Sequence, residues 1–252
     1  YGELQSEEAR ELNAKFVYHT NAIEGSKLSF DDTVKVINRK GGYRVLLQDI
    51  EIGAAPKMAR NADGFDVCEA ITLSEVLSAW LESRKLNLNL SGICRVHESI
   101  FYSTTNHAGI IRKSGESVVV KGSGGIVYSR GAEPEDILPL LNELEQWYSN
   151  SAQYGSLVQA AVVHNQLLHI HPFKDGNGRV SRVLLAQIMN SKGLPVPIVR
   201  VEHKLPYYAA IQEYQQDRNI EPMLNLLLAC AHLNKAEQIF SPLIRRGLRT
   251  IK

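Results

Sequence analysis

The feature that most constrains this chain is the stretch HPFKDGNGRVSR, residues 171–182, because it separates two strong helical patterns. Residues 156–170 (SLVQAAVVHNQLLHI) place apolar side chains at helical spacing and end just before Pro172, which cannot continue a helix. Residues 179–193 (RVSRVLLAQIMNSKG) repeat that spacing and end at a glycine. The sequence therefore predicts a helix–loop–helix unit, and the loop has the composition of a site.

The rest of the chain predicts a mainly α fold with one β-hairpin. Helical spacing recurs over residues 4–18, 30–39, 66–85, 91–103, 133–150 and after residue 201. Ser91 is expected to cap the start of its helix. The β-branched runs of residues 109–128 surround glycines and predict the hairpin. The expected divisions are an N-terminal helical region (1–40), a loop and a helix (41–89), a core with the hairpin (90–200) and C-terminal helices (201–252).

Small residues at the end of the loop predict an anion-binding cradle. Gly176, Asn177 and Gly178 directly precede the second helix, so their N–H groups converge with its unsatisfied donors and positive dipole end. Arg179 and Arg182 lie three residues apart and face one side of the first turn. Two cations are unfavourable at a helix start unless an anion compensates them, and a polyphosphate suits their planar guanidinium groups.

Two further residues of the loop indicate chemistry. A carboxylate such as Asp175 repels a phosphate unless a divalent cation bridges them, and Mg²⁺ commonly uses one or two carboxylates with phosphate oxygens. His171, with an ordinary pKa near ~6.5, suits a general base for a hydroxyl that attacks the bound phosphate. Phe173 is expected to anchor the loop in the core. The residues alone indicate phosphoryl or nucleotidyl transfer.

Other interpretations of the loop fit the residues less well. A hairpin turn at DGNG conflicts with the flanking helices, and an EF-hand lacks its ligands at Arg179 and Ala186. His164, His169 and His171 could bind a metal, but their spacing puts His169 off the face of the other two. We therefore interpret His164 as a hydrogen-bonded core residue. The pattern GxxxxGK[ST] does not occur, which excludes a P-loop.

Composition sets limits on partners and compartment. Lys plus Arg is 28 and Asp plus Glu is 27, so any anion site must be local, with neither nucleic acid nor membrane indicated as a partner. Cys68, Cys94 and Cys230 are isolated, which argues against a disulfide framework or structural zinc and favours a reducing compartment. No signal-peptide pattern and no apolar run of about 18 residues occurs, so we expect a cytoplasmic protein.

The loop also resembles the signature of a known family. HPFKDGNGRVSR matches the Fic-family motif HxFx[DE]GNGRxxR at every specified position. Residues 90–215, roughly, resemble a Fic domain, with a hairpin before the motif and a YYAAI helix after it. The resemblance implies a mostly α Fic fold that binds Mg-ATP. It also implies transfer of AMP to a Ser, Thr or Tyr hydroxyl of a target protein, with release of pyrophosphate.

The family pattern assigns a role to each residue of the loop that matches it. His171 would take the proton of the target hydroxyl, and Asp175 would hold Mg²⁺. Residues 176–178 would cradle the phosphates, and Arg179 and Arg182 would grip the β and γ positions.

Two features outside the loop match the family in part. Tyr208 matches the tyrosine that borders the adenine in some relatives, where a nearby asparagine corresponds to Gln215 here. Plain helix packing is the other interpretation of Tyr207 and Tyr208. The hairpin at residues 108–122 takes the place of the family's flap, an edge strand that aligns the target by β-augmentation. Its expected edge consists of Val118, Val119 and Val120. A hairpin that only covers the site is the alternative.

A second match lies near the N-terminus. TNAIEGS, residues 20–26, fits the family's inhibitory motif [ST]xxxE[GN] through Thr20, Glu24 and Gly25. An acid directly before a helix-ending glycine faces the negative end of the dipole, which is unfavourable by roughly 0.3–1 kcal/mol without a cation. In the family pattern that cation is Arg182, and Glu24 occupies the place of the γ-phosphate. A solvated acid at a helix end is the alternative.

The resulting hypothesis is a protein adenylyltransferase that is inhibited by Glu24 against Arg182 and that also modifies itself. Three alternatives stay open. The same site could remove AMP from a modified target, with Glu24 orienting a water, or could transfer another nucleotide or phosphoryl group. A non-catalytic nucleotide-sensing module is the third, although a pure binder has no need of His171. The sequence leaves a homodimer open.

Overall fold

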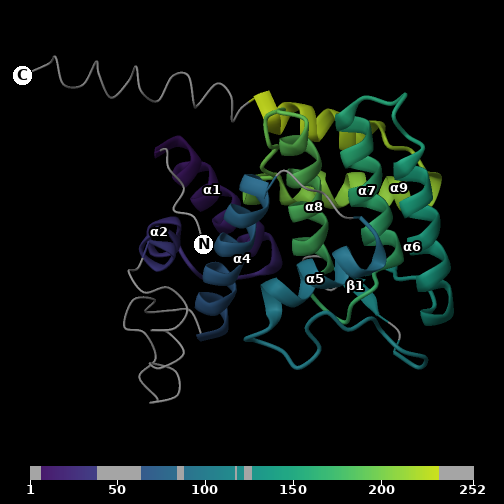
Figure 1. Ribbon diagram of the computed structural model, residues 1–252, viewed down its shortest axis with the longest axis horizontal. Coiled ribbons are helices and arrows are strands. Elements are labelled where there is room, and N and C mark those ends of the chain that lie inside the picture. Colours follow the sequence, from purple (N-terminus) through teal and green to yellow (C-terminus); the bar gives the residue numbers. More distant parts are fainter. Residues whose placement is uncertain (1–6, 39–63, 84–87, 117, 122–126, 233–252) are drawn as a thin grey trace, which may run out of the picture.

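The computed structural model describes residues 7–38, 64–83, 88–116, 118–121 and 127–232. These residues form a mainly α fold with a small two-stranded sheet, as the sequence predicts (Figure 1). The elements in chain order are α1 (Glu7–Glu24), α2 (Phe30–Ile37), α4 (Gly64–Ser83), α5 (Leu90–Phe101), β1 (Val119–Lys121), β2 (Val127–Arg130), α6 (Pro134–Ser149), α7 (Ser156–Ile170), α8 (Asn177–Ser191), the 3₁₀ turn η1 (Val201–His203) and α9 (Lys204–Asp217). Residues 221–232 are also helical.

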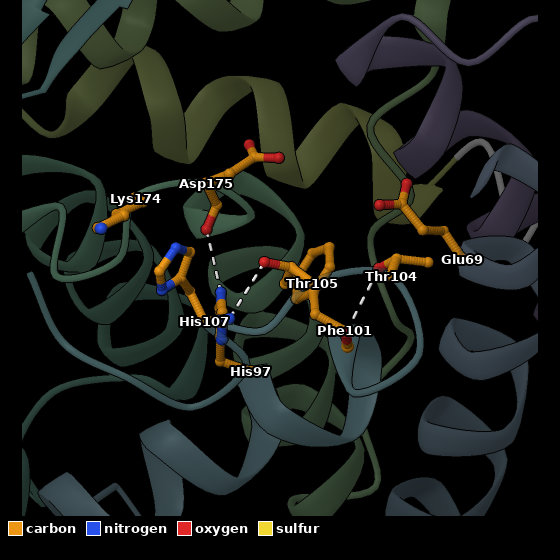
Figure 2. A pocket seen from close by; sticks show the side chains of 8 residues that line it. All are labelled: Glu69, His97, Phe101, Thr104, Thr105, His107, Lys174 and Asp175. Carbon is orange, nitrogen blue, oxygen red and sulfur yellow. Dashed lines mark hydrogen bonds between the residues drawn. The ribbon is translucent and has the colours of Figure 1, made fainter.

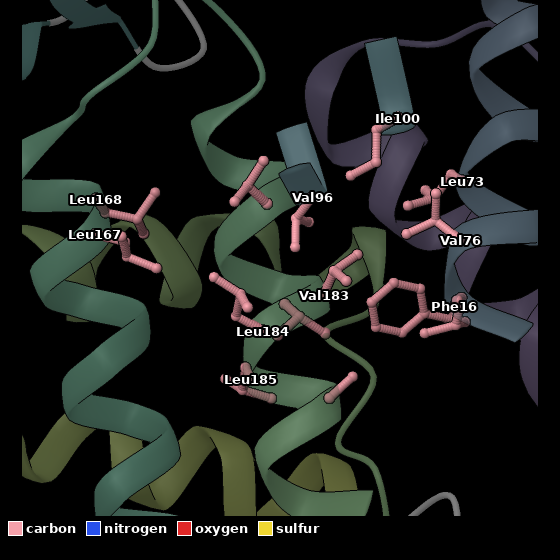
Figure 3. Close-up of a cluster of buried hydrophobic side chains, with 14 of the residues drawn as sticks. Phe16, Leu73, Val76, Val96, Ile100, Leu167, Leu168, Val183, Leu184 and Leu185 are labelled. Carbon is pink, nitrogen blue, oxygen red and sulfur yellow. The ribbon is translucent and has the colours of Figure 1, made fainter. Parts of the chain in front are cut away.

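Helix α8 lies at the centre of the core. It packs against α7 and also contacts α1, α4 and α5. Residues 179–189 of α8 are all buried. A helix enclosed in this way needs apolar side chains around most of its circumference, and the run VLLAQIM supplies them. Figure 3 shows the apolar side chains of α8 between those of α7 on one side and those of α1 and α4 on the other, including Leu167, Leu184, Val183, Phe16 and Leu73.

The arrangement of the helices brings the two predicted motifs together. In Figure 1, α1, α2 and α4 lie on one side of α8, and α6, α7 and α9 lie on the other. The end of α1 and the start of α8 therefore meet, although their contacting residues Glu24 and Arg182 are 158 positions apart in the sequence.

The start of one helix differs from the sequence prediction. Helix α5 begins at Leu90, and the side chain of Asn89 accepts a hydrogen bond from the Gly92 amide at 2.9 Å. Asn89 is therefore the cap, and the prediction of Ser91 is wrong. Serine and asparagine cap almost equally well, so residue type alone could not select the position. Helix α1 extends beyond the pattern of residues 4–18 and ends at Glu24, directly before the expected helix-ending Gly25, which adopts φ +105°.

The strand pairing lies further along the chain than predicted. Val119–Lys121 pairs antiparallel with Val127–Arg130, whereas residues 110–116 form turns and irregular backbone. The reason is the position of Arg112, whose amide donates to the Pro172 carbonyl at 2.9 Å. Residues near Ile110 are thus bonded to the motif loop and are not available to pair with the valine run.

Within the residues that the structure describes, no helix is both long enough and apolar enough to cross a membrane.

Candidate active site

The motif loop is closed by its own side chains. The Asn177 side chain accepts from the Phe173 amide at 3.0 Å and donates to the Phe173 carbonyl at 2.8 Å. The Phe173 ring is 1% exposed, so it anchors the loop in the core as predicted. The side chain of Asn177 thus holds the loop shape, and only its backbone faces the expected cradle.

Close contacts surround two glycines of the loop. Gly176 has φ +78°, and a Cβ there would overlap the ring of Phe101. A Cβ on Gly178 would overlap Oε1 of Glu24. The Glu24 carboxylate therefore lies directly on the first turn of α8, where unsatisfied N–H groups and the positive dipole end favour an anion. An acid of the chain itself thus lies beside the residues for which the sequence predicts an anion-binding cradle.

Arg182, in the first turns of α8, contacts the same carboxylate. Its Nη2 lies 2.5 Å from Glu24 Oε1 and donates to the Thr20 carbonyl at 3.2 Å. Its Nη1 donates to the Tyr207 hydroxyl at 3.2 Å. The side chain of Arg182 is 4% exposed and that of Glu24 is 29% exposed. Burial opposes ionisation of Glu24, but Arg182 outweighs it with help from Arg179, and the pKa of Glu24 stays below its ordinary value.

Arg179 forms an ion pair with a different acid. It pairs with Glu69 of α4, and its Nη2 lies 3.4 Å from Asp175. Its guanidinium carbon sits 4.4 Å from the centroid of the Phe101 ring. The sequence predicts that both motif arginines face one side of the first turn; in the structure Arg179 pairs with Glu69 and lies near Asp175, whereas Arg182 pairs with Glu24. Glu69 had no motif around it in the sequence and could not be found there.

His171 is held in an unusual backbone conformation as a neutral base. It caps α7 with φ 52° and ψ 58°, in the left-handed region that is uncommon for residues other than glycine. Its Nδ1 lies 3.4 Å from the Leu168 carbonyl, which can only accept, so Nδ1 carries the proton and Nε2 keeps a lone pair. Burial is the main reason that the pKa of His171 is lowered to about 4.

Asp175 presents an accessible carboxylate beside the cradle. Its side chain is 85% exposed, while its backbone carbonyl lies 3.1 Å from Nε2 of His97 (Figure 2). Nδ1 of His97 accepts from the Gly109 amide at 2.8 Å, so Nε2 carries the proton and donates to Asp175. The His97 ring also stacks on Phe173, with 3.9 Å between centroids. Burial lowers the pKa of His97 to about 4, so a neutral imidazole supports the loop from beneath.

A cavity of about 210 Å³ adjoins Asp175. Its lining includes Glu69, Lys174 and the ring of Phe101 (Figure 2). Across the described parts of the chain, no group of three or more His, Cys, Asp or Glu side chains could by itself hold a metal ion. A cation at Asp175 would therefore need ligands from a bound phosphate or from water.

The two tyrosines at the start of α9 differ in burial. Tyr207 is 1% exposed, and its hydroxyl lies 2.9 Å from Nε2 of His164 and bonds Arg182. His164 is fully buried in this contact, which confirms it as a hydrogen-bonded core residue. Tyr208 is half-buried, with its ring 5.6 Å from that of Tyr207 and 5.8 Å from Nζ of Lys204.

The base of the sheet is joined to the motif loop. The Gly131 amide donates to the Val118 carbonyl at 3.2 Å, and the Ala132 amide donates to the Ile170 carbonyl at 3.2 Å. Of the valines expected at the docking edge, Val119 and Val120 belong to β1, and Val118 directly precedes it. This strand therefore starts next to the loop that carries His171.

The sequence of the chain is similar to that of a known protein family. Residues 87–189 match the sequence model of the Fic/DOC family. The protein adenylyltransferase Fic of Aedes aegypti is 26% identical over 229 residues, which are 88% of this chain and 40% of that protein. The protein adenylyltransferase fic-1 of Caenorhabditis briggsae is 28% identical over 207 residues, 80% of this chain and 36% of that protein. The chain thus spans about two fifths of the length of these relatives.

Solved structures share the fold. A Fic domain containing signaling protein from Bacteroides thetaiotaomicron superimposes with a TM-score of 0.74 at 21% identity, covering 92% of this chain and 88% of that one. Fic-1 of Caenorhabditis elegans superimposes with a TM-score of 0.69 at 23% identity, covering 94% of this chain and 65% of that one.

Proposed function

We propose that the chain, whose residues 87–189 match the Fic/DOC family model, is a self-inhibited protein adenylyltransferase. It would transfer AMP from Mg-ATP to a Ser, Thr or Tyr hydroxyl of a target protein, and to itself. The observation that carries the proposal is the Glu24 carboxylate on the first turn of α8, paired with Arg182. A strong anion site next to a neutral histidine is filled by the chain's own acid.

The phosphates of ATP fit the same site once Glu24 leaves it. The backbone N–H groups of residues 176–178 and the positive end of α8 favour a bound phosphate. Arg182 loses its acid partner in that state, and a γ-phosphate oxygen can replace the carboxylate in the same charge-assisted bond. Arg179 would contact the β position from the side of Glu69. Tyr208, half-buried beside Tyr207, is our candidate for the surface that borders the adenine.

The residues around Asp175 fit a magnesium ion. One exposed carboxylate beside a phosphate cradle is a usual protein contribution to Mg²⁺, which takes its other ligands from phosphate oxygens and water. The single weak contact of Asp175 with Arg179, at 3.4 Å, leaves its oxygens accessible. When bound, the ion would offset phosphate charge and so stabilise the transition state.

His171 is suited to the proton transfer of the reaction. The oxygen of the target hydroxyl bonds to the α-phosphorus, and the bond from that phosphorus to the pyrophosphate oxygen breaks. The hydroxyl proton moves to Nε2 of His171, whose lone pair is free because Nδ1 faces the Leu168 carbonyl. A pKa of His171 lowered to about 4 keeps the imidazole neutral and ready to accept at neutral pH.

The strand β1 would align the target. Val118, Val119 and Val120 lead from the base of the motif loop into the sheet. An extended target segment added to that edge would gain backbone hydrogen bonds and would carry its hydroxyl past His171.

Inhibition by Glu24 follows from the same contacts. With its carboxylate on Gly178 and Arg182, ATP can bind only with displaced phosphates, and the α-phosphorus is then out of line with the incoming hydroxyl. Correct positioning of reactants can account for several orders of magnitude in rate. The resting chain is therefore expected to be nearly silent.

Mass spectrometry tests the proposed function. Purified Glu24→Gly chain and a cell lysate are incubated together with Mg-ATP, and the modified peptides are identified. Attachment of AMP to hydroxyl side chains, lost when His171→Ala is added to the Glu24→Gly chain, is the expected result. Attached phosphate in place of AMP, or bound ATP with no modified peptide, would contradict adenylyl transfer and favour a phosphotransferase or a nucleotide sensor.

A further inference from the structure

Arg112 is a buried arginine whose bonds all reach main-chain carbonyls. Its side chain is 3% exposed. Nε donates to the carbonyl of His171 at 2.8 Å, and Nη1 donates to the carbonyl of Glu116 at 2.7 Å. Nη2 donates to the carbonyl of Ala132 at 2.8 Å and to the carbonyl of Ile170 at 3.4 Å. Its own amide donates to the Pro172 carbonyl at 2.9 Å. These partners come from three separate segments of the chain.

Two of these partners are the carbonyl of Ile170, which is the last residue of α7, and that of His171, which caps the helix. A helix leaves its final carbonyls without intrahelical donors, and a cation at that end is favoured by the dipole. A helix often ends with a residue in the left-handed conformation, and this residue is usually glycine. At the end of α7 this residue is His171. That conformation is unfavourable for a residue with a side chain, so the surroundings must hold it. The Nε bond of Arg112 to the His171 carbonyl is a contact that does so.

The other partners belong to the base of the sheet. Glu116 lies shortly before β1, and Ala132 lies shortly after β2. Gly131 fits tightly in the same place, because a Cβ there would lie 2.8 Å from Nη2 of Arg112 and 2.8 Å from Cβ of His171. The guanidinium thus sits between the residue that bears the base and the strand pair that would carry the target.

We propose that Arg112 is a positioning residue for the reaction, which sets the direction of the His171 imidazole and fixes the sheet base against it. The inference rests on the proposed function, since it concerns how base and target hydroxyl meet. Arg112 makes none of the contacts of the anion site at Glu24 and Arg182. Its loss should therefore affect the chemical step and leave ATP binding intact.

Variants of two kinds test the inference in the Glu24→Gly chain. Arg112→Ala removes the guanidinium, and Gly131→Ala keeps it but forces it away from His171. Gly64→Ala is the matched control, because a Cβ there meets nothing within 4 Å. We expect kcat to fall roughly 100-fold in both site variants, with the ATP dissociation constant changed less than about twofold. Added guanidinium ion should restore part of kcat in Arg112→Ala only.

Amide hydrogen exchange provides a readout that does not depend on transfer. The amides of His171, Gly131 and Ala132 should lose protection together in Arg112→Ala and should regain it with guanidinium. If no chain transfers AMP but this exchange pattern appears, the proposed function fails and the coupling by Arg112 stands. If Arg112→Ala lowers thermal stability while kcat and the exchange of these amides stay as in the Gly64→Ala control, Arg112 only supports the fold and the inference is wrong.

Discussion

Replacing Glu24 by glycine removes the acid that fills the anion site. The carboxylate lies 2.5 Å from Nη2 of Arg182, whose side chain is buried, whereas the side chain of Glu24 is 29% exposed. Arg182 keeps its bonds to the Thr20 carbonyl and the Tyr207 hydroxyl, but it loses its counter-ion. Glu24→Gly should therefore weaken the ligand-free chain and at the same time open the site to ATP.

The contacts of the pair set the expected size of both effects. Breaking a fully buried ion pair costs about 3–5 kcal/mol, and because Glu24 is partly exposed and Arg182 keeps two bonds, the loss in unfolding free energy should fall below about 3 kcal/mol. A charge-assisted hydrogen bond contributes about 1.5–3 kcal/mol, which is the gain when a phosphate oxygen takes the place of the carboxylate. Mg-ATP should then bind roughly 10- to 150-fold more tightly. Transfer of AMP should rise by about 100-fold or more, because the α-phosphorus comes into line.

The assays are calorimetry with Mg-ATP, thermal unfolding with and without ATP, and AMP incorporation. Glu8→Gly is the matched control, because Glu8 is an exposed acid at the other end of the same helix. Glu24→Gly combined with Arg182→Ala should lose the gain in affinity, since the freed guanidinium is what ATP uses.

Three results would refute the reasoning on Glu24. Affinity and transfer that match those of Glu8→Gly would make the end of α1 a purely structural element. A gain that survives Arg182→Ala would show that the guanidinium is not the group released. Loss of an AMP-removing activity in Glu24→Gly, with no gain in transfer, would support the hydrolytic alternative, in which Glu24 orients a water.

The remaining predictions concern the motif loop. His171→Ala should lower transfer by about 10²–10⁴-fold with unchanged ATP affinity, and a rate within about twofold of the parent chain would exclude His171 as the base. Because burial lowers the pKa of His171 to about 4, transfer by Glu24→Gly should stay level from about pH 8 to about pH 6; a midpoint near 6.5 would show an imidazole that titrates as if exposed. The unfolded chain binds that proton more tightly, so the unfolding free energy measured with urea should fall as the pH drops below about 6.5. Asp175→Ala should abolish both transfer and its dependence on Mg²⁺, and calorimetry showing unaltered Mg-ATP affinity together with normal turnover would argue against a metal role.

Local patterns predicted the helix–loop–helix unit because its signals are carried by adjacent residues. Pro172 ends one helix, and glycines open the next. The family resemblance also predicts the contact of Glu24 with Arg182. These two residues belong to separate motifs and are 158 positions apart. The bounds of the hairpin were not predicted correctly, because the paired strands begin only at Val119. β-branched runs show that strands form, but the partner of the valine run depends on Arg112, which holds the preceding segment against Pro172.

The supporting residues of the site could not be found from the sequence. Each of them contacts a partner that is distant in the sequence. Arg112 donates to a carbonyl 59 residues away, and His97 donates to a carbonyl 78 residues away. Glu69 pairs with a guanidinium group 110 residues away. Each contact exists only after the helices pack, and no spacing rule connects the partners. The sequence indicates only that Tyr207 can pack as an aromatic residue. Its hydroxyl accepts a hydrogen bond from Arg182 only once the helices have packed.

The most direct test of the central claim compares two labelled forms of ATP. The wild-type chain and Glu24→Gly are incubated with ATP labelled at the α-phosphate or at the γ-phosphate, and the label bound to protein is counted. An adenylyltransferase locked by Glu24 gives α-label on Glu24→Gly, little on the wild-type chain, and no γ-label on either. Label from the γ-phosphate on protein, or equal α-label on the two chains, would contradict the account.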